Sequence, residues 1–148
     1  MQTVGLMYIA STAGNLIVSS TLKPIVSSTI SLIGSLTTSS ISHESLDVVI
    51  VEIDVAATIK TIEATILTIN SHKEPLKTAS TTVINAIQNI NDTLTKIADV
   101  TASHASGYIS RWRILNLDTE IAELRSGMTI LNKRFALLCN INTMNNNT

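Results

Sequence analysis

The chain has 148 residues, a formal net charge of −1 and only 14% charged residues, against about 25% in ordinary soluble domains. Its length suits one domain with a single core. Its basic residues are scattered and aromatic residues make up 3%, which excludes the basic patches and stacking platforms of nucleic-acid-binding proteins. We therefore expect no nucleic-acid partner.

Residues 1–42 form an apolar segment whose one charged side chain is Lys23. No cationic stretch precedes it as in a secretory signal, and serine and threonine fill much of it. We expect one or two helices, broken at Pro24. Each charge-free run is also long enough to span a membrane, so membrane contact through residues 1–42 stays open. The localisation is open as well, with the cell interior or an assembled particle favoured.

Residues 43–141 have the pattern of a helical bundle, with helices at about 45–70, 75–101 and 108–141. The first two carry apolar residues three and four positions apart and are joined by a short polar connection ending at Pro75, which indicates an antiparallel hairpin. A short strand at 51–55 is the alternative, because these residues alternate and are β-branched. The expected hairpin core consists of Val55, Ile59, Ile62, Ile66, Ile69, Val83, Ile87, Ile90, Leu94 and Ile97.

The helix at 108–141 carries an unbroken heptad seam over four repeats. Such a seam packs one helix against another, either between chains as a coiled coil or within one chain as a bundle. The residues of this helix interface are Ile114, Leu117, Ile121, Leu124, Met128, Leu131, Phe135 and Leu138. The charged residues that flank the seam are Arg113, Asp118, Glu120 and Arg125. In a parallel two-stranded coil they would form attractive inter-helix pairs.

A second apolar strip runs along the back of the same helix. It consists of Leu115, Ala122, Ile130 and Leu137. A free two-stranded coil would keep these positions polar, so the helix is predicted to pack on its own chain and also on a neighbour. The residues that follow, 142–148, are an Asn-rich polar tail that we expect to be disordered.

No catalytic or cofactor motif is present in the sequence. The three histidines, His43, His72 and His104, lie far apart at predicted helix boundaries, and Cys139 has no second cysteine with which to form a disulfide. Trp112 is interpreted as a core residue at the start of the last helix, with an interfacial anchor as the alternative. We therefore expect neither an enzyme nor a bound metal or cofactor.

Together these patterns predict an all-α, antiparallel helical bundle with heptad packing and a long C-terminal helix. The expected function is that of a non-catalytic structural protein that self-associates or cements a larger complex, such as a virion or another particle. Its partners would be further copies of itself or other protein subunits. Two alternatives remain: a membrane-associated protein with an N-terminal anchor, and a small helical carrier of an apolar ligand.

Overall fold

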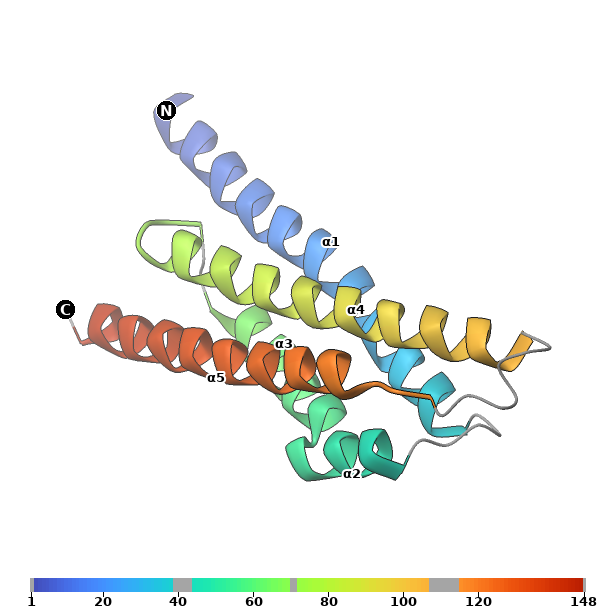
Figure 1. The fold of residues 1–148 in the computed structure, drawn as a ribbon. Coiled ribbons are helices and arrows are strands. Elements are labelled where there is room, and N and C mark those ends of the chain that lie inside the picture. Colours follow the sequence, from blue (N-terminus) through green and yellow to red (C-terminus); the bar gives the residue numbers. More distant parts are fainter. Residues whose placement is uncertain (1, 39–43, 70–71, 107–114, 148) are drawn as a thin grey trace.

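The computed structural model describes residues 2–38, 44–69, 72–106 and 115–147, with side chains for residues 18–37, 46–52, 54–69, 72–106 and 115–147. Its elements are α1 (Gln2–Thr38), α2 (Glu44–Ile53), α3 (Val55–Thr68), α4 (Leu76–Ser106) and α5 (Asp118–Asn146) (Figure 1). These ranges contain no strand. The all-α prediction is therefore confirmed, and the alternative of a strand at 51–55 is wrong.

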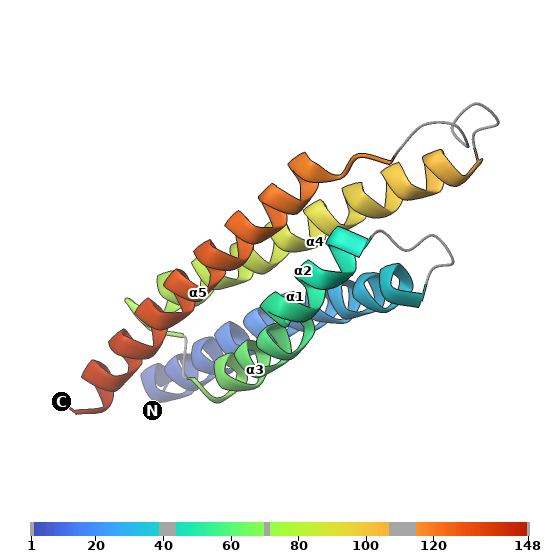
Figure 2. The same ribbon diagram turned by 60° about the horizontal axis from the view of Figure 1, so that its bottom comes forward.

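The helices pack around a common core as a bundle. Helix α4 contacts both α5 and α1, α1 also contacts α3, and α2 contacts α5, so the contacts close a ring. Helices α2 and α3 follow each other as one bent column (Figure 2). Helices α4 and α5 run in opposite directions, because Lys96 meets Glu123 whereas Thr82, earlier in α4, meets Arg134, later in α5.

Helix α1 continues through Pro24, so the expected break there is wrong. Leu22 and Val26 lie on either side of the proline and are almost fully buried. Their packing supports the helix across the hydrogen bond that the proline removes. The buried stripe continues to Ile33 and Leu36, which places this part of the N-terminal segment inside the bundle. No helix in the described ranges is apolar enough over its length to cross a membrane.

The helix expected at 45–70 is interrupted at Asp54, which has left-handed backbone angles of φ 49° and ψ 51°. The Asp54 N–H donates to the Val51 carbonyl at 3.2 Å, and the Asp54 carbonyl accepts from the Thr58 N–H at 3.0 Å. The backbone therefore turns at Asp54 without leaving these two groups unpaired. The turn lets α2 pack on α5 while α3 packs on α1.

This bend also changes the predicted hairpin. Helix α4 packs mainly on α5 and α1, so the hairpin of residues 45–70 with 75–101 is not the main packing pair. All ten residues named for its core are nevertheless buried, at 6% exposure or less. They fill one core shared by several helices.

The last two helices have bounds that differ from those expected. Helix α4 runs to Ser106 rather than to residue 101, and α5 begins at Asp118 rather than at 108; residues 107–114 lie outside the described ranges. The Asn116 side-chain oxygen accepts from the Asp118 N–H at 3.0 Å, which satisfies one of the free donors at the start of α5.

At its other end α5 continues to Asn146, so the expectation of disorder is wrong for residues 142–146. No glycine or proline follows Gly127 to stop the helix. The Thr143 hydroxyl donates to the Cys139 carbonyl at 2.9 Å, one turn earlier. The polar composition of this segment is therefore compatible with a helix.

Candidate assembly surface

The inner face of α5 is the heptad seam, and it is buried within the chain. All four leucines of the seam, Leu117, Leu124, Leu131 and Leu138, are 0% exposed. Ile121 and Met128 are also buried, Phe135 is half-buried against the core, and Ile114 lies outside the described residues. Because α5 packs on α4 and α2, the seam's apolar residues are already covered by the chain's own helices.

Gly127 lies where α5 packs closely on α4. A Cβ atom at this position would lie 3.2 Å from Cγ1 of Ile90, which is tight for a carbon contact. Nearby, Nη1 of Arg134 donates to the Thr82 carbonyl of α4 at 2.9 Å. Glycine destabilises a helix by about 1 kcal/mol relative to alanine. At position 127 the missing Cβ leaves room for the Ile90 side chain of α4.

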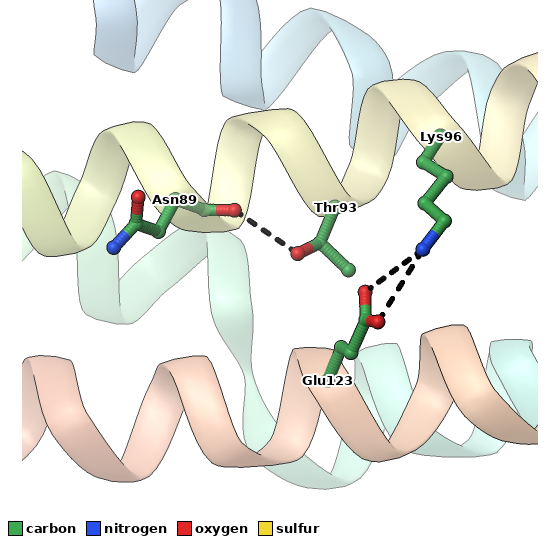
Figure 3. A network of polar contacts seen from close by, with 4 residues as sticks. All are labelled: Asn89, Thr93, Lys96 and Glu123. Carbon is green, nitrogen blue, oxygen red and sulfur yellow. Dashed lines mark hydrogen bonds and ion pairs between the residues drawn. The ribbon is translucent and has the colours of Figure 1, made fainter.

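The charges that flank the seam also act within the chain. Arg125 lies 3.5 Å from Glu52 of α2, and Lys96 of α4 lies 3.3 Å from Glu123 of α5 (Figure 3). About half of each side chain is exposed, so each pair contributes only about 0–1 kcal/mol. Asp118 lies in the first turn of α5, where the helix dipole favours a carboxylate.

Glu120 also lies in that first turn, whereas Arg113 is outside the described residues. The parallel pairs expected between two chains would need Arg125 to face a second α5. In the structure Arg125 faces Glu52 of its own chain instead.

An open groove of about 860 Å³ lies between α4 and α5. Small residues such as Ala86, Ala122 and Gly127 line it, and the carboxylates of Asp92 and Glu123 are among its polar groups. A carrier of apolar ligands would need an enclosed cavity, and this groove opens to solvent. It therefore does not favour the carrier alternative.

The outer face of α5 carries three exposed apolar side chains. Ile130 is 40% exposed, Leu137 is 55% exposed and Met144 is 69% exposed. They are seven residues apart, which places them on one stripe of the helix because seven residues make almost two full turns. We call Ile130, Leu137 and Met144 the outer stripe.

The outer stripe differs from the back strip that the sequence predicted. Leu115 is half-buried before α5 begins. Ala122 lines the groove, as Ile130 also does, but its side chain is a single methyl group, so neither Leu115 nor Ala122 adds a large exposed apolar side chain to the stripe. Met144 was missed because residues 142–148 were expected to be disordered. The seven-residue spacing of Ile130, Leu137 and Met144 was the available signal for it.

The other large exposed apolar side chains among the described residues form no comparable row. Val48 and Val51 lie one turn apart on α2, and Leu67 lies on α3. Scattered residues of this kind are common on protein surfaces. The outer stripe runs from Ile130 to Met144, or about 21 Å along the helix.

Among the described residues, the structure does not bring the remaining candidates together into a chemical site. His72 precedes α4 and His104 lies near its end, so the length of the helix separates them. Cys139 is half-buried and free, while His43 and Trp112 lie outside the described residues. No group of three metal-binding side chains occurs in the described ranges.

Comparison with protein-family models, curated proteins and solved structures finds no match to the chain. What the chain does is therefore inferred from the buried and exposed faces of its helices.

Proposed function

We propose that this chain is a non-catalytic assembly protein that associates with further copies of itself through the outer stripe of α5. The observation that carries the proposal is the contrast between the two faces of this helix. Its inner leucines are fully buried, whereas Ile130, Leu137 and Met144 expose 40–69% of their surface. A protein that acts as a monomer gains no stability from a row of exposed apolar side chains.

The two faces of α5 have different tasks in this proposal. The inner face builds the bundle, and the outer face joins one bundle to the next. Fully burying a Leu, Ile or Met side chain contributes about 1.5–3 kcal/mol. Each copy contributes three such residues, so the contact would be of moderate strength and dependent on protein concentration.

The charge of the whole chain supports association. A formal net charge of −1 over 148 residues provides little electrostatic repulsion between copies, and proteins with a net charge near zero associate more readily. Serine, threonine and asparagine also surround the outer stripe, at positions such as Ser126, Thr129 and Asn140. These neutral side chains can form hydrogen bonds at the rim of an interface.

Two neighbouring leucines provide a matched test. Leu137 is 55% exposed on the outer face, whereas Leu138 is 0% exposed on the inner face. We expect Leu137→Glu to keep its helical circular dichroism and lose self-association, by about tenfold or more in the association constant, because each copy loses apolar burial. We expect Leu138→Glu to lose folded structure, because it buries an unpaired charge. Light scattering coupled to size exclusion reports the mass of each variant.

Leu67→Glu is the surface control, because Leu67 is 42% exposed on α3 and lies outside the outer stripe. This variant is expected to keep both its fold and its mass. A Leu137→Glu variant that assembles as strongly as the unaltered chain would refute the proposal.

A further inference from the structure

The outer stripe is symmetric about its middle residue. Ile130 and Met144 each lie seven residues from Leu137, in opposite directions along α5. A twofold rotation about an axis through Leu137 therefore places Ile130 of one copy opposite Met144 of the other. Such an interface uses the same patch on both copies and closes after two of them.

The charges along α5 distinguish the two ways in which a pair of these helices can align. One heptad before Ile130 the same stripe reaches Glu123, whose side chain is 45% exposed. In a parallel pair in register, Glu123 would face Glu123, and the exposed Lys133, which is three residues after Ile130, would face Lys133. Like charges placed opposite each other destabilise a helix pair.

An antiparallel pair avoids this repulsion. From residue 135 to 146 α5 has no charged side chain, so Lys133 would face the neutral residue Ile141 of the other copy. Glu123 would lie beyond the overlapping part of the partner helix. The dipoles of the two helices would also oppose each other, which is the favourable arrangement for neighbouring helices.

Arg134 does not contribute a charge to the outer stripe. Its Nη1 atom donates to the Thr82 carbonyl at 2.9 Å, and the side chain is half-buried. The charge of Arg134 is therefore held against α4 of its own chain, and the direction of the pair depends on Glu123 and Lys133.

We infer that two copies of this chain form an antiparallel pair through the outer stripes of their α5 helices, with the twofold axis near Leu137. This inference rests on the proposed function and specifies the partner and its direction. Each Ile130 packs beside Met144 of the other copy. The acidic first turns of the two α5 helices then lie at opposite ends of the pair.

Cross-linking through single cysteines tests the direction. In a Cys139→Ser background, one variant carries Ile130→Cys and a second carries Met144→Cys; both positions are exposed, so the core is unchanged. In an antiparallel pair, residues 130 and 144 of different copies are adjacent, whereas equivalent cysteines are about 21 Å apart along the helix. A bifunctional thiol reagent much shorter than this distance is added to each variant alone and to their mixture.

The inference predicts that the mixture cross-links to a heterodimer, identified by intact mass, and that neither variant cross-links with itself. Self-cross-linking of each variant, with no excess of the heterodimer, would overturn the antiparallel pair and leave the proposed function standing. A chain that assembles in solution but gives no cross-link in any sample would overturn the pairing through this stripe. An unaltered chain that remains a monomer by sedimentation would refute the proposed function as well.

Discussion

A small polar cluster is buried where α1 meets α4. The Asn91 side-chain amide donates to the hydroxyls of Ser28 and Thr29, each at 3.0 Å. Thr29 is 0% exposed, and its hydroxyl also donates to the Ile25 carbonyl at 2.7 Å. Apolar stripes alone allow two helices to slide along each other, whereas a buried polar contact favours one register. We therefore interpret Asn91 as the residue that sets how α1 lies on α4.

Replacing Asn91 by alanine tests this role. The variant Asn91→Ala loses two hydrogen bonds in a buried site, and we expect its unfolding free energy to fall by about 1–3 kcal/mol. Urea denaturation measures the change. Asn89→Ala is the matched control, because Asn89 is exposed on the same helix, and its effect should stay within about 0.5 kcal/mol. Equal effects of the two substitutions would contradict the interpretation.

The bend between α2 and α3 depends on one backbone conformation. Asp54 is the one non-glycine residue with positive φ among those that the structure describes. Left-handed backbone costs an ordinary L-residue roughly 1–2 kcal/mol, and aspartate and asparagine accept it more readily than most. Without this bend, α2 and α3 would form one straight helix that could not follow α5 and α1 in turn.

Substitution of Asp54 by glycine or by valine should therefore affect the stability of the chain differently. Glycine adopts positive φ freely and valine strongly disfavours it. We therefore expect the free energy of unfolding of Asp54→Val to be at least about 1 kcal/mol lower than that of Asp54→Gly. At Lys60, an exposed helical position of α3, the order should be reversed, because valine is the better helix former there. Denaturation curves of the four variants measure both differences. The same order at both positions would contradict a left-handed Asp54.

The sequence predicted helices and buried residues well because both depend on local periodicity. Apolar residues three and four positions apart mark the inner face of a helix whichever partner covers it, and this is why Ile59, Ile87 and Leu124 were assigned correctly to buried faces. Periodicity does not name the partner. The seam of α5 is compatible with a second chain, with α2 or with α4, and the structure covers it with α4 and α2.

The points that the sequence did not predict depend on single residues or on tertiary packing. The period continues unbroken across Asp54, so nothing in the pattern revealed its left-handed backbone. Pro24 is a reliable helix breaker only where packing does not support the helix on both sides. The exposed face of α5 was underestimated because the polar composition of residues 142–146 concealed that the helix, and with it the stripe, continues to Met144.

In the proposed assembly, different helix faces of the molecule would serve folding and association. Buried isoleucines and leucines from α1 to α5 form one continuous core, while the outer stripe remains free of it. Association of this kind is weak enough to be reversible when few residues contribute. Stability of the bundle and affinity between bundles can then change independently, as the Leu137 and Leu138 substitutions are designed to show.

Sedimentation equilibrium of the unaltered full chain over a wide concentration range tests self-association most directly. The chain has a mass of 15.9 kDa, and we predict an apparent mass that rises with concentration towards twice this value and then levels off, as expected for a closed twofold pair. A mass of 15.9 kDa at every concentration would contradict the proposal that α5 joins one bundle to another.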